Sequence, residues 1–134
     1  MLSYKTSYRV RYADIDKMGF AHHANYFRWF EVGRSEMFRQ IGLPYKEIEA
    51  SGVYLPLSEI HCEFKSPAQY DDLLIIKTDL DASRKATIQF HYQIYSEDEN
   101  TLVATGFTKH ACMDADGRVV RPPDFLLDAI RKNT

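Results

Sequence analysis

The first part of the chain alternates between apolar and polar side chains, and the alternation ends before residue 13. Across residues 4–12, aromatic or apolar residues such as Tyr8 recur at every second position, with charged residues such as Arg9 between them. A period of two predicts a strand with one buried face. Residues 13–22 break this alternation and include Gly19, so we expect a loop there.

From about residue 23 to residue 41 the apolar period becomes that of a helix. Gly42 and Pro44 supply its stop signal, and residues 45–52 are compatible with a second, short helix. Gly33 costs ~1 kcal/mol relative to Ala inside a helix, so we expect another element to pack closely against it. The positions predicted for the buried face of the long helix are Phe27, Phe30, Met37, Phe38 and Ile41.

The period returns to two after Gly52 and predicts four further strands, followed by a short helix that opens at Pro122-Pro123-Asp124. Short turns between the four strands favour an antiparallel meander in chain order, with the first strand added at its edge. At 134 residues the chain fits one domain, residues 1–134, of α+β class. One sheet over one helix leaves apolar surface uncovered, which predicts a homodimer or homotetramer. The four predicted strands span residues 54–66, 71–81, 85–97 and 101–114.

Composition narrows the class of protein. Lys and Arg total 17 against 19 Asp and Glu, a net charge of −2, so we expect no nucleic-acid partner. The longest apolar run, residues 73–76, is far below the ~20 residues that span a bilayer, so we expect no membrane insertion. The amino terminus lacks the apolar stretch of a signal peptide, which favours the cytoplasm. Cys62 and Cys112 are expected to be small buried hydrophobic residues, and their spacing suggests no metal site.

Residues 12–26 carry the candidate chemistry. They form the predicted loop and the first turn of the long helix, where free backbone N–H groups favour negative charge and a developing oxyanion. Asp16 places a carboxylate on this loop, Gly19 permits a tight turn, and His23 and Asn25 stand at the helix entrance. Asp14 points the opposite way along an extended backbone, and we expect a capping or turn role for it.

The motif Asp-x-Asp-x-x-Gly-x-x-x-His-x-Asn-Tyr, from Asp14 to Tyr26, resembles hotdog-fold acyl-CoA thioesterases of the 4-hydroxybenzoyl-CoA thioesterase type. It is most similar to the branch of small Tol-Pal-associated bacterial thioesterases. The resemblance implies a hotdog fold, in which an antiparallel five-stranded sheet wraps one long helix. It also implies hydrolysis of a thioester to a free acid and coenzyme A, with no cofactor because coenzyme A is part of the substrate.

The resemblance also implies roles for individual residues. Asp16 is the implied nucleophile or general base, assisted by Tyr12 and His23, and the backbone N–H of His23 polarises the thioester carbonyl. His22 and Met18 replace residues common in that branch, which bears on substrate preference. The positions expected to bind substrate or shape its site are Gly19, His22, Asn25, Tyr26, Lys65, Ser66, Pro67, Ser83, Arg84 and Lys85.

Two other functions stay open from the sequence. A thioesterase acting on acyl carrier protein would use the same pantetheine chemistry. A non-catalytic acyl-CoA sensor would bind the thioester without cleaving it, although a retained carboxylate at Asp16 favours an enzyme.

Overall fold

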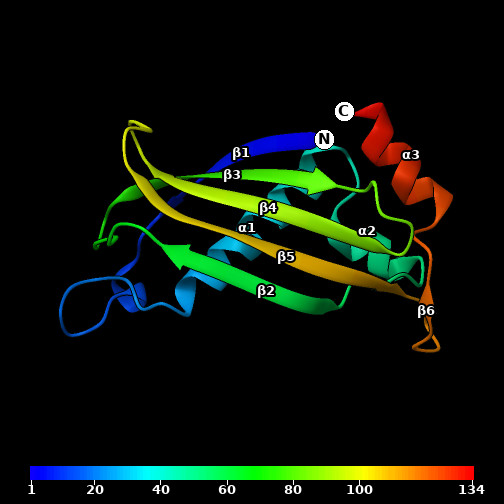
Figure 1. Ribbon diagram of the computed structural model, residues 1–134, viewed down its shortest axis with the longest axis horizontal. Coiled ribbons are helices and arrows are strands. Elements are labelled where there is room, and N and C mark those ends of the chain that lie inside the picture. The colour runs from blue at the N-terminus through cyan, green and yellow to red at the C-terminus, as the bar shows by residue number, and fades with distance from the viewer.

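The computed structural model describes residues 1–134 and contains one long helix, one curved sheet and several short elements (Figure 1). The predicted elements all form, and each strand begins and ends within three residues of its expected bounds. The elements are β1 (Leu2–Arg9), a 3-10 turn (Tyr12–Asp14), α1 (Asn25–Gln40), α2 (Tyr45–Ala50), β2 (Leu57–Phe64), β3 (Leu73–Asp81), β4 (Thr87–Ser96), β5 (Leu102–Met113), β6 (Val119–Val120) and α3 (Asp124–Lys132).

All strand pairs are antiparallel, but the sheet order is β1-β3-β4-β5-β2, with the two-residue β6 added to the end of β5. The expected meander is therefore correct only for β3, β4 and β5. The strand predicted over 54–66 pairs with β5 rather than with β3, and it forms the edge opposite β1.

The connection between β2 and β3 explains this error. Residues 65–72 do not form a hairpin, because they pair with the loop that follows β1 instead. The N–H of Ala21 donates to the carbonyl of Ala68 at 2.8 Å. The N–H of Val10 donates to the carbonyl of Asp72, and the carbonyl of Val10 accepts from the N–H of Asp71, both at 2.9 Å. The segment carries the chain from one sheet edge to the other, past the start of α1.

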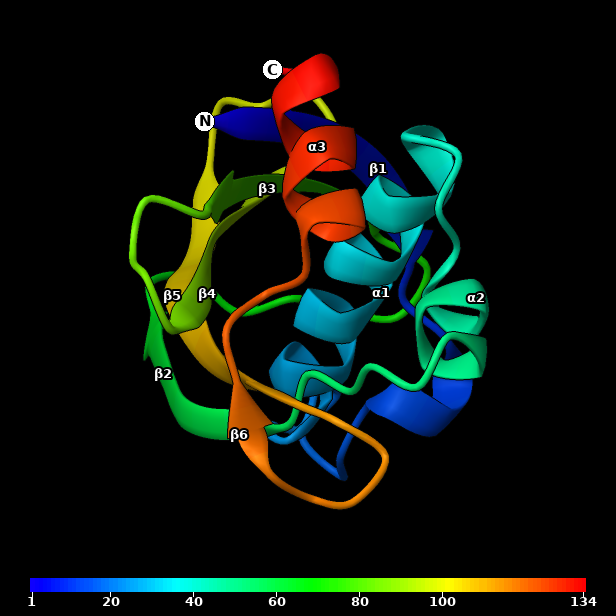
Figure 2. The same ribbon diagram turned by 90° about the vertical axis from the view of Figure 1, so that its right-hand side faces the viewer.

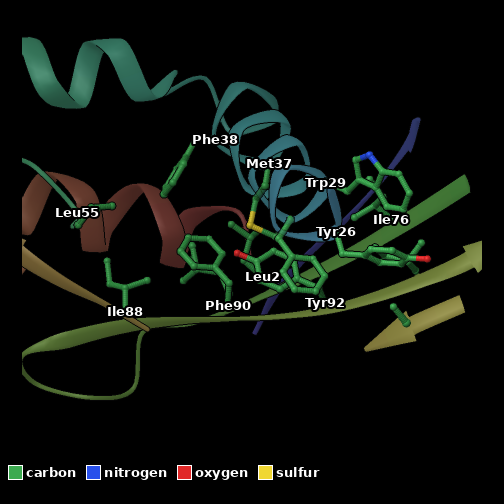
Figure 3. Packing of buried hydrophobic residues seen from close by; sticks show 14 of the residues in the cluster. Leu2, Tyr26, Trp29, Met37, Phe38, Leu55, Ile76, Ile88, Phe90 and Tyr92 are labelled. Carbon is green, nitrogen blue, oxygen red and sulfur yellow. The ribbon is translucent and has the colours of Figure 1, made fainter. Parts of the chain in front are cut away.

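The sheet curls around α1, so that β1 and β2 flank the helix (Figure 2). This is the hotdog arrangement that the resemblance implied, which confirms the predicted fold class. The core lies between the helix and the concave face of the sheet (Figure 3). Phe30 stacks on Tyr92 there, with ring centroids 4.2 Å apart and planes 7° apart.

The buried face of α1 is only partly the one predicted. Phe30, Met37 and Phe38 are buried, but Phe27 and Ile41 lie at its margin and are half-exposed. Their places in the core are taken by two other aromatic residues of the first turns, Tyr26 and Trp29. The strong alternation in β4 is confirmed, because its even-numbered apolar residues are all buried.

Two glycines set how closely α1 approaches the sheet. A Cβ on Gly33 would overlap Thr78 Oγ1 and touch Ile76, which confirms the expected close packing at this position. A Cβ on Gly106 in β5 would overlap the ring of Phe30. The helix axis can therefore sit lower on the sheet than any side chain at these positions would permit.

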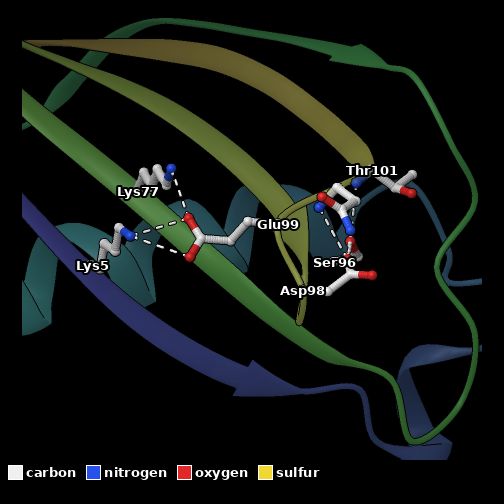
Figure 4. A network of polar contacts seen from close by, with 7 residues as sticks. Lys5, Lys77, Ser96, Asp98, Glu99 and Thr101 are labelled. Atoms are coloured by element: carbon white, nitrogen blue, oxygen red, sulfur yellow. Dashed lines mark hydrogen bonds and ion pairs between the residues drawn. The ribbon is translucent and has the colours of Figure 1, made fainter.

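The outer face of the sheet is polar. Glu99, in the turn after β4, bridges Lys5 on β1 and Lys77 on β3 at 3.1 and 2.8 Å (Figure 4). The two lysines lower the pKa of Glu99. Asp98 in the same turn accepts hydrogen bonds from Ser96 and from the backbone of Asn100, which closes the hairpin.

Other sequence expectations have clear outcomes. Cys112 is buried, whereas Cys62 is only half-buried, and both are free thiols. None of the helices is long and apolar enough to cross a membrane. Several apolar side chains along the edge strand β2 remain exposed in a single chain, including Leu57, Ile60 and Phe64.

Candidate active site

The loop between β1 and α1 is tightly folded around Gly19. Gly19 has a φ of 83°, and its N–H donates to the carbonyl of Asp16 at 3.0 Å. The N–H of Asp16 donates back to the carbonyl of Phe20 at 2.8 Å. A left-handed φ is strained for any residue with a side chain, so the predicted turn at Gly19 is confirmed.

Asp14 is a structural residue of this loop, as expected. Its side chain is 5% exposed and accepts hydrogen bonds from the hydroxyl of Tyr8 at 2.7 Å and the N–H of Arg11 at 2.8 Å. Its carbonyl accepts hydrogen bonds from the N–H of His22 and the side-chain amide of Asn25, both at 2.8 Å. Burial and the bond to Asp14 raise the pKa of Tyr8. Asp14 thus ties β1, the loop and the start of α1 together.

Asn25 organises the loop through that amide bond, which is buried. Its other side-chain atom, Oδ1, accepts a hydrogen bond from Arg28 one turn further along α1. Both ends of the Asn25 side chain are therefore occupied by the protein, so its role in the site is to position the loop.

The carboxylate of Asp16 is exposed and only half engaged. Oδ1 accepts hydrogen bonds from the N–H groups of Met18 at 2.8 Å and Phe20 at 3.3 Å. Oδ2 accepts no hydrogen bond within the chain. One oxygen of Asp16 is thus held by the loop while the other is available to an incoming group.

The start of α1 offers a free hydrogen-bond donor. The backbone N–H of His23 has no partner within the chain, whereas that of Ala24 is bound to His22 Nδ1 at 3.3 Å. The rings of His22 and His23 lie close together but tilted, with centroids 4.2 Å apart and planes 32° apart. The partial positive charge of a helix N-terminus adds to the attraction of such a donor for an oxyanion.

A hollow of about 310 Å³ opens beside this helix end. It brings together five of the residues predicted from the sequence, which come from the helix entrance and from the segment after β2: His23, Tyr26, Lys65, Ser66 and Pro67. Phe64, Phe20 and Ala21 complete its lining.

Phe64 and Phe20 were missed from the sequence. The ring of Phe64 meets the ring of Tyr26 edge-on at 4.8 Å, so it forms an apolar wall of the hollow. The sequence did offer a signal for Phe64. It comes directly before Lys65, at the end of a strand whose apolar residues did not all fit a core.

Asp16, Gly19 and His22 lie on the same loop as Phe20 and Ala21 but do not line the hollow, and other predicted site residues lie further from it. Tyr12 is 75% exposed and packs edge-on against Tyr70, with no contact to Asp16. Ser83, Arg84 and Lys85 occupy the turn after β3, at the opposite end of the sheet (Figure 1). The nine residues of β3 separate the two ends by ~25 Å. A single chain therefore does not bring this turn to the hollow.

Comparison with known proteins relates the whole chain to one family. Residues 10–130 match the family model described as the Thioesterase-like superfamily. A candidate esterase of Aquifex aeolicus is 36% identical over 123 residues, covering 92% of this chain and 94% of its own length. The acyl-CoA thioester hydrolase YbgC of Escherichia coli is 31% identical over 106 residues, covering 79% of this chain and 78% of its own.

Solved structures show the same relationship as the sequence comparisons. A DHNA-CoA thioesterase from Staphylococcus aureus superposes with a TM-score of 0.90 at 28% identity, covering 98% of this chain and 91% of its own. These matches agree with the order of elements and with the loop before α1. They show that the chain belongs to the thioesterase-like superfamily.

Proposed function

We propose that this thioesterase hydrolyses an acyl-CoA thioester at the start of α1, where the loop that carries Asp16 meets the hollow. The observation that carries the proposal is the pairing, on one loop, of a carboxylate with a free oxygen at Asp16 and an unbonded N–H at His23. Thioester hydrolysis needs these two groups: one activates water or attacks the carbonyl carbon, and the other stabilises the charge on the carbonyl oxygen.

The reaction can follow either of two routes with these groups. In one, Asp16 Oδ2 attacks the carbonyl carbon, the C–S bond breaks, and water hydrolyses the resulting mixed anhydride. In the other, Asp16 takes a proton from the water that attacks. In both, the thiolate of coenzyme A leaves and is protonated, and the N–H of His23 contributes ~3 kcal/mol of stabilisation as one oxyanion-hole donor.

The walls of the hollow fit the arm that carries the thioester. Phe20, Phe64 and Tyr26 offer apolar and aromatic surface, and Lys65 and Ser66 add polar groups. Such a lining suits a pantetheine chain, which alternates amide and methylene groups. The phosphates of coenzyme A must be bound by other residues, and we propose that Arg84 and Lys85 of a second copy bind them.

Replacing Asp16 tests the proposal. Asp16→Asn keeps the shape of the side chain but removes its charge and basicity, so we expect kcat to fall at least ~10²-fold. Release of free thiol from a panel of acyl-CoA thioesters measures the rate. His23→Ala should have an intermediate effect because the backbone N–H remains.

Asp14→Asn is the matched control, because it removes the charge of a buried carboxylate on the same loop but keeps an oxygen that can accept the hydrogen bonds from Tyr8 and Arg11. It should lower kcat much less than Asp16→Asn. An Asp16→Asn variant as fast as wild type would overturn the assignment. Tight binding of acyl-CoA without thiol release would favour a sensor, and faster turnover of acyl carrier protein thioesters would favour that substrate class.

A further inference from the structure

A second cavity, of about 110 Å³, lies between the carboxyl-terminal half of α1, the chain around α2 and the sheet. Its inner residues are buried: Phe38, Leu55, Phe90 and His110 are each less than 10% exposed. Its mouth is formed by Glu31, Arg34 and Ser35 on α1, which are half-buried or exposed. The cavity thus has an apolar interior and a charged entrance.

This cavity is separate from the hollow at the start of α1. Tyr26, Phe30 and Arg34 follow one another at intervals of four along the helix and so lie on one face. Tyr26 lines the hollow and Arg34 lines the cavity. Phe30 between them is fully buried and stacked on Tyr92, which fills the space that would connect the two.

A directed chain of hydrogen bonds runs beneath the cavity. His110 Nδ1 lies 3.0 Å from the carbonyl of Leu55, which can only accept, so Nδ1 carries the proton. His110 Nε2 then accepts from Thr108 Oγ1 at 2.9 Å, and Thr108 accepts from the hydroxyl of Tyr92 at 2.7 Å. Tyr92 in turn accepts from Arg34 at 3.4 Å. Every acceptor in the chain is therefore occupied.

Arg34 is left as an uncompensated positive charge. It forms no ion pair with any carboxylate, including Glu31 at the same mouth, and its bond to Tyr92 uses one N–H of five. Burial lowers the pKa of His110 to about 4, so the imidazole is neutral and Arg34 is the charged group that faces the cavity from α1. The remaining guanidinium donors need an acceptor, and a carboxylate matches them in charge and in geometry.

We propose that this cavity binds the carboxylate of a short aliphatic acid, with the carboxylate on Arg34 and the hydrocarbon against Phe38, Leu55 and Phe90. A cavity of roughly 150 Å³ admits benzene, so one of about 110 Å³ suits a chain of about two to four carbons. The proposal does not depend on the reaction at the start of α1.

Titration of the full chain with sodium butyrate, at constant ionic strength made up with sodium chloride, tests the proposal. Two-dimensional NMR should show saturable shifts of the His110 imidazole and the Leu55 amide. Butyramide, which has the same shape without the charge, should bind at least ~10-fold more weakly. Arg34→Gln should weaken butyrate binding by a similar factor, and Arg34→Lys should weaken it less than Arg34→Gln because the positive charge remains although the forked geometry is lost.

Arg39→Gln is the matched control, since Arg39 lies on the same helix but is exposed and paired with Glu36. It should change the affinity less than two-fold, roughly the scatter of such measurements. Circular dichroism confirms that each variant is folded. The proposal is overturned if butyramide binds as well as butyrate, if a folded Arg34→Gln variant keeps wild-type affinity, if the shifts appear only around His23, or if nothing saturates.

Discussion

At the scale of single residues, two aspartates on one loop have carboxylates in different surroundings. Asp14 is buried, and one of its side-chain oxygens is held by Tyr8 and Arg11. Asp16 is exposed, and its Oδ2 has no partner within the chain. The sequence predicted a capping or turn role for Asp14 and a free carboxylate at Asp16, and the hydrogen-bond partners of each oxygen agree with both expectations.

A buried histidine predicts how stability depends on pH. Burial lowers the pKa of His110 in the folded chain from 6.5 to about 4. As pH falls below 6.5 the unfolded chain takes up a proton at His110 and the folded chain does not, so the free energy of unfolding decreases between pH 6.5 and 4. The imidazole contacts the Leu55 carbonyl and Thr108 directly, and Tyr92 and Arg34 follow Thr108 along the same chain of hydrogen bonds.

Urea unfolding at several pH values measures this effect. His110→Gln should lose the part of the pH dependence that belongs to the imidazole, while His61→Gln, at an exposed position, should keep the wild-type slope. Equal slopes for wild type and His110→Gln between pH 6.5 and 4 would contradict the expectation.

At the scale of elements, the separation of α1 from the sheet is set at Gly33. Gly33→Ala would add ~1 kcal/mol of helix propensity, but its Cβ would overlap Thr78 and touch Ile76. Overpacking of this kind costs ~1–3 kcal/mol, so we expect a net loss in the free energy of unfolding. Chemical denaturation measures it, and Gln40→Ala, at an exposed position of α1, is the control. A more stable Gly33→Ala variant would show that α1 can move away from the sheet without loss.

At the scale of the whole molecule, the exposed apolar residues of β2 predict an assembly. β2 is an edge strand with unpaired backbone groups, and Ile60 on it is 37% exposed. Pairing with a second copy would cover both features. Light scattering should give at least twice the 15.6 kDa of one chain at micromolar concentration. Ile60→Lys should weaken the assembly and Gln40→Lys should not, whereas a monomeric wild type would contradict the prediction.

The turn after β3 gives a second prediction at this scale. Arg84 and Lys85 lie at the far end of the sheet from His23, so they can serve the hollow only from another chain. Replacing both with Ala should raise KM for acyl-CoA and leave kcat nearly unchanged, because phosphate contacts are equal in the ground and transition states.

Mixing this double variant with Asp16→Asn distinguishes contact in trans from contact in cis. A mixed dimer with contacts in trans contains one site with both an intact Asp16 and an intact turn, so the low KM should return. If the mixture keeps the high KM although the chains exchange, the turn does not act across the interface.

The sequence by itself determined the local features of this protein. Alternation fixed β1 and β4, helical spacing and Gly42 fixed α1, and the need for a left-handed turn fixed Gly19, because each depends on neighbours within a few positions. The motif around Asp16 also indicated the family, since it combines residue types and spacing within one short segment.

Only the tertiary structure decided what depends on distant contacts. It placed β2 beside β5, because residues 68–72 bond to the segment after β1 and carry the chain across the molecule instead of closing a hairpin between β2 and β3. It buried Trp29 in place of Phe27, because the curled sheet encloses a different face of α1 from the one that apolar spacing favoured. It also separated Arg84 from His23 by the length of the sheet, since antiparallel strands send successive turns to opposite ends.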